Sequence, residues 1–193
     1  LSALDAQIRT SLRDDIHRIQ RELGITTVFV THDQEEALSV SDRVVVMNAG
    51  RADQIGTPSD IYNRPTTRFV ADFVGQLNTF NAQQVGPKSL HFAGVDMDGL
   101  DLSSVAANSA VTVALRPEAM SLNRRPTDTQ SLPGRVLHSS FLGSVIRAQV
   151  DVAGTPVSID MFNRAGVTVP AHGAPTEVWF AHDDLVILPE SAT

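Results

Sequence analysis

Apolar residues recur at spacings of three and four over the first part of the chain. This period places them on one face of a helix, with charged residues such as Arg9, Arg13 and Arg18 on the other face. Gly24 stands where a glycine commonly ends a helix. The pattern therefore predicts an amphipathic helix whose apolar series is Leu4, Ile8, Leu12, Ile16, Ile19 and Leu23.

The next segment is typical of an α/β protein. Thr26 to Val30 is rich in β-branched and aromatic residues and lacks alternation, which predicts a parallel strand buried on both faces. A second helix is expected from Asp33 to about Val40, and a strand from Arg43 to Met47. Asn48-Ala49-Gly50 then turns the chain into a shorter strand that ends near Ile55.

Thr57-Pro58-Ser59-Asp60 predicts the start of a short helix. Threonine is a good cap, proline suits the first helical position, and the carboxylate at the third position can accept from the cap amide. Pro65 stops this helix. The apolar pairs of Phe69 to Val74 predict one more element that ends at Gly75, and a domain boundary is expected between Gly75 and Asn78.

Beyond Asn78 the chain consists of short β-like runs separated by Gly, Pro and Asn. Several short strands at this spacing predict a small barrel or sandwich. Loops are expected at 106–108 and 124–130. The predicted strands are Ser89 to Phe92, Val111 to Leu115, Arg135 to Ser139, Val145 to Val152, Pro156 to Asp160, Glu177 to Phe180 and Leu185 to Leu188.

Composition narrows the classes of function. The 193 residues carry a formal net charge of -7, which argues against a general nucleic-acid surface because phosphates are neutralised by clustered Lys and Arg. Cysteine is absent, which excludes disulfides and thiolate metal sites. No apolar run approaches the roughly 18 to 20 residues of a membrane span. Any membrane association is therefore expected to occur through a partner.

The candidate chemistry lies in the first half, and each candidate has a structural alternative. His32 follows the predicted buried strand, where open α/β sheets bind ligands, and an imidazole there can contact a terminal phosphate or an attacking water. The alternative is a helix start whose acidic first turn matches the helix dipole. Ser2 and Asp5 likewise fit the S-x-x-D capping pattern without any catalytic role. The residues alone leave both interpretations open.

Several motifs together resemble one family. Leu1 to Gly75 resembles the later half of the ATPase subunit of an ATP-binding-cassette (ABC) importer, of the branch that serves maltose, polyamines, sulfate, ferric iron or phosphonates. Residues 76–193 resemble the OB-like, TOBE-type regulatory barrel of these subunits. The matching segments are Ser2-Ala3-Leu4-Asp5 for the D-loop, Thr31 to Ala37 for the histidine switch, Asp42-Arg43 to Met47, Gln54 to Pro58, Leu115 to Glu118, Phe141 to Ser144 and Glu177 to Leu188.

This resemblance implies an α/β remnant of a RecA-like P-loop ATPase domain at residues 1–75, followed by an all-β OB-like domain at 76–193. It implies that His32 contacts the terminal phosphate of ATP and that Asp5 crosses a dimer seam. Ser2, Ala3 and Leu4 would line the nucleotide with Asp5 and His32. The implied partners are a second ATPase subunit, the membrane permease and, indirectly, an extracytoplasmic solute-binding protein. The implied location is the cytoplasmic face of the membrane.

Parts of the family's machinery do not occur in this sequence. The phosphate loop G-x-x-x-x-G-K-[ST], the Ser-Gly-Gly signature and the Asp-Glu pair that hold phosphate and Mg²⁺ are missing. We therefore expect a fragment that binds no ATP or metal by itself and hydrolyses none. The transported solute stays open, because selectivity in such systems resides in the binding protein and the permease.

Other interpretations of the second half are open. Residues 76–193 are alternatively a stand-alone module that senses an oxyanion or another small ligand, or that dimerises. An OB-type nucleic-acid binder is disfavoured by the aromatic content of 5% and the acidic balance. For Arg116-Pro117-Glu118 the favoured interpretation is structural: proline ends a strand and the two charges are solvated in a turn.

Overall fold

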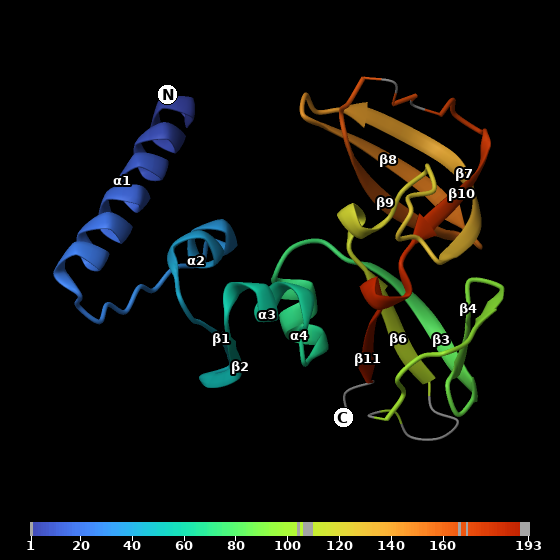
Figure 1. The fold of residues 1–193 in the computed structure, drawn as a ribbon, viewed down its shortest axis with the longest axis horizontal. Helices are drawn as coiled ribbons and strands as arrows, with labels where there is room; N and C mark the ends of the chain where they lie inside the picture. The colour runs from blue at the N-terminus through green and yellow to red at the C-terminus, as the bar shows by residue number, and fades with distance from the viewer. Residues whose placement is uncertain (1, 104, 106–109, 166, 169, 190–193) are drawn as a thin grey trace. The chain divides into compact units, whose positions relative to one another are not determined.

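The computed structural model describes residues 2–103, 105, 110–165, 167–168 and 170–189. Side chains at 2–7, 9, 10, 110 and 189 are outside this description, as is the loop predicted at 106–108. The chain divides into two compact units (Figure 1). The N-terminal unit comprises Leu1–Pro65 and Phe69–Gly75, and the C-terminal unit comprises Thr66–Arg68 and Gln76–Thr193.

The N-terminal unit begins with the predicted helix. Helix α1 spans Ser2–Leu23, and the N–H of Gly24 closes it on the carbonyl of Gln20 at 3.0 Å. Gly24 has a φ of +62°, a conformation that glycine adopts without steric cost. The apolar stripe of α1 stays largely exposed, from Ile8 to Leu23.

The strand predicted at Thr26 to Val30 is wrong. The structure has no regular element there, and Val28 and Val30 are 87% and 90% exposed. A buried parallel strand requires hydrogen-bonded neighbours and a covering layer on each face. In the described part of this unit, the strands pair only with each other, so nothing completes the ladder of this segment.

The remaining elements of the N-terminal unit confirm the predictions. Helix α2 covers Gln34–Val40, strands β1 (Val44–Asn48) and β2 (Arg51–Gly56) form an antiparallel hairpin, and α3 (Pro58–Asn63) and α4 (Arg68–Phe73) follow. Ala49 and Gly50 both have positive φ, as a two-residue hairpin turn requires. Thr57 and Asp60 form the predicted capping box. A small core of Val46, Ile61, Val70 and Val74 joins the hairpin to α3 and α4.

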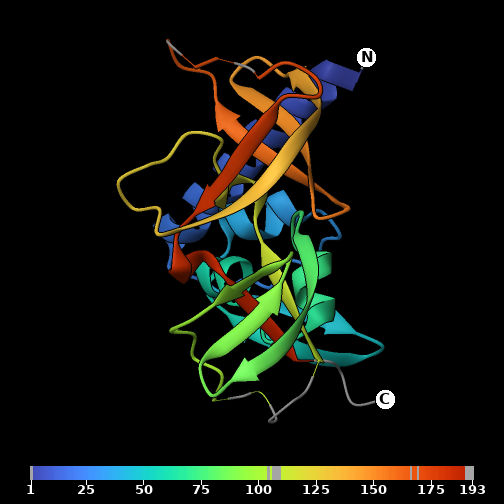
Figure 2. The ribbon, with the colours of Figure 1, turned by 90° about the vertical axis from the view of Figure 1, so that its right-hand side faces the viewer.

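The C-terminal unit is built of antiparallel strands in two sheets (Figure 2). The five-stranded sheet has the order β11-β6-β3-β4-β5, and the four-stranded sheet has the order β10-β7-β8-β9. Both sheets contribute to one apolar core that includes Phe92, Leu132 and Phe180. The strands are β3 (Asn78–Gly86), β4 (Ser89–Phe92), β5 (Val95–Met97), β6 (Ala110–Leu115), β7 (Gln130–Phe141), β8 (Val145–Val152), β9 (Thr155–Phe162), β10 (Pro175–Phe180) and β11 (Val186–Pro189).

All seven strands predicted in this half are present, with β7 longer than expected. Strands β3 and β5 were not predicted. Two short 3₁₀ helices, η1 (Pro117–Ala119) and η2 (His182–Asp184), complete the unit.

The side chain of Asn78 links the two sheets. Its Oδ1 accepts from the Ser158 N–H and its Nδ2 donates to the Ser158 carbonyl, both at 2.7 Å. Nδ2 also lies 3.1 Å from the sulfur of Met120. One buried amide on β3 thus satisfies both backbone groups of a residue on β9.

The solvated turn predicted at Arg116-Pro117-Glu118 is wrong in part. Arg116 is 5% exposed, and its Nη1 donates to the Gln76 carbonyl at 3.0 Å. A buried guanidinium requires such acceptors, which a sequence pattern does not reveal. Pro117 is also buried, whereas Glu118 is exposed as expected.

Among the described residues, none of the helices combines the length and apolar composition that a membrane crossing requires.

Candidate functional site

The loop that presents His32 is fixed by three hydrogen bonds among its neighbours. The Thr31 hydroxyl donates to Glu36 Oε2 at 2.7 Å and accepts from the Asp33 N–H at 2.9 Å. The Glu36 N–H donates to Asp33 Oδ1 at 3.2 Å, which makes Asp33 the N-cap of α2. The chain is therefore held on both sides of His32, while His32 itself is exposed.

The structural interpretation of Asp33 is confirmed, since its side chain caps α2. Glu35 and Glu36 supply the acidic first turn that favours a helix N-terminus. These findings do not remove the functional interpretation of His32, because a capped helix also holds the preceding loop in place. The role of His32 in nucleotide contact stays a prediction.

Two longer-range contacts hold this loop and its helix within the N-terminal unit. Arg13 of α1 forms an ion pair with Glu36, with 3.5 Å between Nε and Oε1. The N–H of Gly75, just past α4, donates to Oε1 of Gln34 at 2.6 Å. The sequence pattern predicts neither contact, because Arg13 belongs to the predicted polar face of its helix and no spacing signal connects residues 34 and 75.

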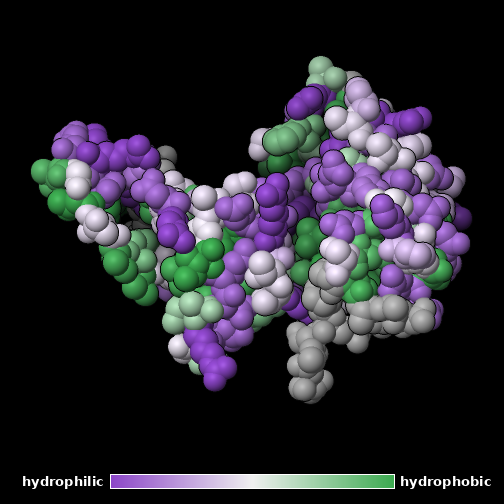
Figure 3. Space-filling view, turned by 60° about the horizontal axis from the view of Figure 1, so that its bottom comes forward, coloured by the Kyte–Doolittle hydropathy of each residue, from purple (hydrophilic) through white to green (hydrophobic). Residues whose placement is uncertain are grey.

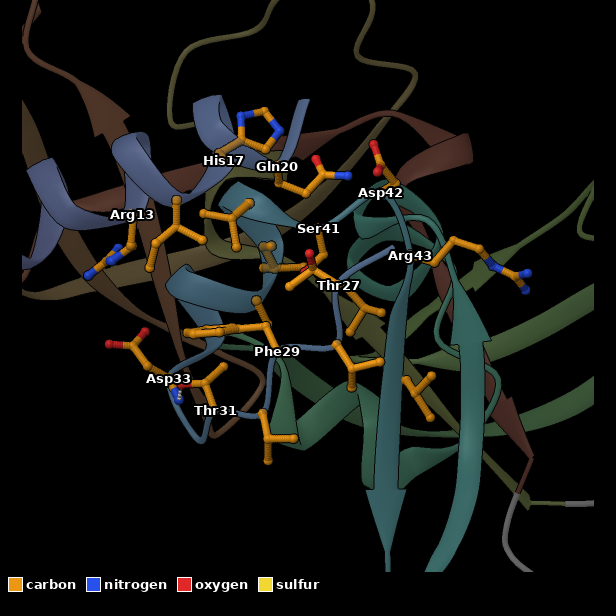
Figure 4. Close-up of a pocket in the computed structure, with 18 of the residues that line it drawn as sticks. Arg13, His17, Gln20, Thr27, Phe29, Thr31, Asp33, Ser41, Asp42 and Arg43 are labelled. Carbon is orange, nitrogen blue, oxygen red and sulfur yellow. Dashed lines mark hydrogen bonds between the residues drawn. The ribbon is translucent and has the colours of Figure 1, made fainter. Parts of the chain in front are cut away.

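A hollow of about 1030 Å³ lies beside the His32 loop, within the N-terminal unit. Figure 4 shows it bordered by side chains of α1, of the irregular segment before α2 and of the start of β1. Its lining is mixed, with Arg13, Asp33 and Arg43 next to the apolar Ile16 and Phe29.

The other predicted site residues lie at the start of α1. Ser2, Ala3, Leu4 and Asp5 have helical backbone, and their side chains are outside the described part of the chain. The structure therefore does not test the predicted D-loop. Within the described residues, no group of three or more His, Asp or Glu side chains is placed to hold a metal ion.

The sequence has one lysine, Lys88, and it follows Pro87. The Gly-Lys pair that ends a phosphate loop is therefore absent from these 193 residues. Nothing in the described site replaces it as a cradle for a triphosphate.

The comparison with protein families bears on the C-terminal unit. Residues 113–188 match the TOBE domain, and this range includes strands of both sheets of that unit. The C-terminal unit, whose described secondary structure is mostly β, therefore contains a TOBE domain. The RecA-like character of the N-terminal unit stays a prediction.

Three similar proteins are all named as import ATP-binding proteins. The sulfate/thiosulfate import ATP-binding protein CysA 2 of Chromobacterium violaceum is 42% identical over 187 residues. The spermidine/putrescine import ATP-binding protein PotA of Borreliella afzelii is 37% identical over 186 residues, and the Fe(3+) ions import ATP-binding protein FbpC of Rhizobium etli is 40% identical over 167. This chain is thus related to the ATP-binding subunits of ABC importers, as its motifs indicated.

The matches cover 92%, 95% and 83% of this chain but only 50%, 53% and 46% of the three relatives. The chain therefore spans about half the length of the curated relatives that it matches. A solved structure of the cytoplasmic molybdate-binding protein ModG aligns with 65% of this chain and 99% of that chain, with a TM-score of 0.43 and 11% identity.

Proposed function

We propose that this chain acts as part of the ATP-binding subunit of an ABC importer and supplies the histidine switch and the TOBE-type domain. The observation that carries the proposal is the similarity to three import ATP-binding proteins over 83–95% of the chain. The geometry supports it, because His32 is exposed on a loop whose flanking residues are fixed.

In the proposed reaction, ATP is the substrate and His32 orients the water or the terminal phosphate. An imidazole can do both, since it donates and accepts protons near neutral pH. The Thr31, Asp33 and Glu36 contacts would keep the backbone on both sides of His32 in place between turnovers. Asp5 would support the phosphate loop of a second subunit across a dimer seam.

The proposed partners follow from the same role. Two such subunits would close around the nucleotide and drive the membrane permease, which receives solute from an extracytoplasmic binding protein. The protein would then act at the cytoplasmic face of the membrane. The relatives import sulfate or thiosulfate, polyamines and ferric ions by their names, and we assign none of these solutes to this chain.

These 193 residues are proposed to be inactive alone, since the phosphate loop and signature are absent from them. Mg²⁺ normally neutralises the phosphates in this chemistry. The described residues offer no group of three or more His, Asp or Glu side chains for it.

The alternative, an oxyanion-sensing module in residues 76–193, has less support. Arg116 is engaged by the Gln76 carbonyl and Arg147 by Asp160, through two hydrogen bonds of 2.7 Å. These two buried or partly buried cations therefore already have partners within the protein.

The proposal is tested by fusion to a relative. The segment of the Chromobacterium violaceum protein that precedes the matched region is joined ahead of this chain, and ATP hydrolysis is measured with and without His32→Ala. We expect turnover by the fusion and a loss of about a hundredfold or more in the variant, because a lost proton-transfer or orienting group typically costs 10²–10⁴ in rate.

His91→Ala serves as the matched control, because His91 is also exposed and lies in the β4–β5 hairpin of the C-terminal unit. Turnover that is equal in the fusion and in His32→Ala would refute the role of His32. A fusion that folds and binds ATP but hydrolyses none would refute the proposed function.

A further inference from the structure

We infer that Arg13 and Glu36 form a positioning pair, which holds the His32 loop at a fixed position relative to helix α1. This inference rests on the proposed function, because it concerns the residues that orient the proposed switch. Neither residue is expected to contact nucleotide. Their proposed effect is transmitted through Thr31 and the backbone of Asp33.

The carboxylate of Glu36 joins two partners from different parts of the unit. Oε2 accepts from the Thr31 hydroxyl at 2.7 Å, and Oε1 faces Nε of Arg13 at 3.5 Å. The two charged side chains are only 17% and 20% exposed. Figure 4 places Arg13, Thr31 and Asp33 at the same side of the hollow. Charges that are largely removed from water interact more strongly than surface pairs.

The Arg13 contact is an ion pair and not a hydrogen bond. Nε of Arg13 is buried and makes no hydrogen bond in the structure, and 3.5 Å is at the limit of the range for one. Loss of Glu36 would therefore leave a partly buried cation without its counter-charge, which is costly. The pair is thus held by charge, and removal of either member would disturb the other.

Loss of the Glu36 charge would affect the His32 loop through two hydrogen bonds of Thr31. With Glu36 neutralised, the Thr31 hydroxyl loses a charged acceptor, and Thr31 in turn anchors the Asp33 N–H. These two residues flank His32. Because α1 also carries the segment Ser2 to Asp5 in its first turns, the pair ties the helix of the proposed D-loop to the switch loop.

A purely structural role would give a different outcome. Helix α2 keeps its Asp33 cap without Glu36, and the core of Val46, Ile61, Val70 and Val74 contains neither Arg13 nor Glu36. We therefore expect Glu36→Gln and Arg13→Met to leave the unit folded while the His32 loop changes. The chain offers close controls: Glu35 is the exposed neighbour of Glu36, and Arg21 of α1 forms an exposed ion pair with Asp42 at 3.6 Å.

The first test uses the chain itself and needs no activity. The imidazole resonances of His32 are assigned by NMR through their loss in His32→Ala. We expect Glu36→Gln and Arg13→Met to shift or broaden them, and Glu35→Gln and Arg21→Met to leave them in place. Arg13→Lys, which keeps the charge, is expected to restore most of the wild-type signal.

The second test uses the fusion protein of the previous section. We expect Glu36→Gln and Arg13→Met to lower kcat by between about tenfold and a hundredfold, the scale of loss from a small misplacement of a catalytic group, with KM for ATP within about twofold. Equal NMR signals and equal kcat in these variants and their controls would overturn the inference, even if His32→Ala abolishes turnover. If the wild-type fusion folds and binds ATP but hydrolyses none, the proposed function fails, and unchanged His32 signals in the variants would separately refute the pair.

Discussion

Asp128 shows how one carboxylate fixes a loop of the C-terminal unit. Its side chain is fully buried, and it accepts from the Arg125 N–H at 2.6 Å and from Arg125 Nε at 2.9 Å. Burial by itself disfavours the charged form. The hydrogen bonds and positive charge of Arg125 outweigh that effect, so the pKa of Asp128 is held below its ordinary value.

This lowered pKa gives stability a definite pH dependence. Since the folded-state pKa lies below the unfolded-state value of about 3.9, the ionised carboxylate stabilises the fold above about pH 4, and this contribution is lost as pH falls through the folded-state pKa. We expect Asp128→Asn to lower the free energy of unfolding at pH 7 by about 1–3 kcal/mol. The loss is expected to shrink near pH 2.

Urea unfolding at the two pH values, followed by the fluorescence of Trp179, the one tryptophan of the chain, measures this difference. The fully exposed Asp183 provides the control, as Asp183→Asn. An equal loss for Asp128→Asn at pH 7 and at low pH would contradict the assigned role of its charge.

At the scale of elements, the sequence predicted the helix ends and turns that depend on local interactions. The capping box at Thr57, the end of α1 at Gly24 and the Ala49-Gly50 hairpin all depend on residues next to one another, and all three are present. The sequence did not predict strand β5, although Ala93-Gly94 between β4 and β5 repeats the Ala-Gly pair of the first hairpin and both residues adopt positive φ.

What the sequence did not predict depends on distant partners. Strand β3 carries only a short apolar alternation, Phe80 and Ala82, among polar residues, and it forms because it pairs with β6 and β4. The apolar segment Thr26 to Val30 is not a strand because it has no such pairing. In the candidate site, the motif predicted the positions of His32 and of the Asp33 cap. It did not predict the ion pair of Arg13 with Glu36 or the hydrogen bond of Gln34 with Gly75, because these partners are 23 and 41 positions apart in the sequence.

The link between the two sheets can be tested at Asn78. Asn78→Ala leaves the Ser158 N–H and carbonyl without their partner, and we expect the free energy of unfolding to fall by about 2–4 kcal/mol, since each unsatisfied buried group costs about 1–3. Urea unfolding measures the change. Asn81→Ala on the same strand is the control, because Asn81 is exposed and its loss is expected to cost little. Similar losses for the two variants would show that the amide does not link the sheets.

At the scale of the whole molecule, the surface of the N-terminal unit carries many apolar side chains (Figure 3, left). They include Leu12 and Leu23 of α1 together with Val28, Phe29 and Val30. Exposed apolar area of this extent marks an interaction surface. We expect the chain to self-associate through it, and the double variant Val28→Asp with Val30→Asp to reduce the molar mass measured by light scattering.

The control adds the same charge without removing apolar area. Thr26 and Thr27 are exposed in the same segment, and Thr26→Asp with Thr27→Asp is expected to leave association largely intact. If both double variants stay as associated as the wild type, the contact lies elsewhere, with the TOBE-type unit as the next candidate.

The amide of Asn78 also bears on how long the C-terminal unit stays folded. Asn78 and Ser158 are 80 residues apart, so their contact closes a long loop. The chain entropy lost on closing this loop is offset only when most of the unit has folded. Contacts of this range accompany slow folding, and those made after the transition state act chiefly on the unfolding rate. We therefore expect this single side chain to govern the lifetime of the folded unit more than the speed with which it forms.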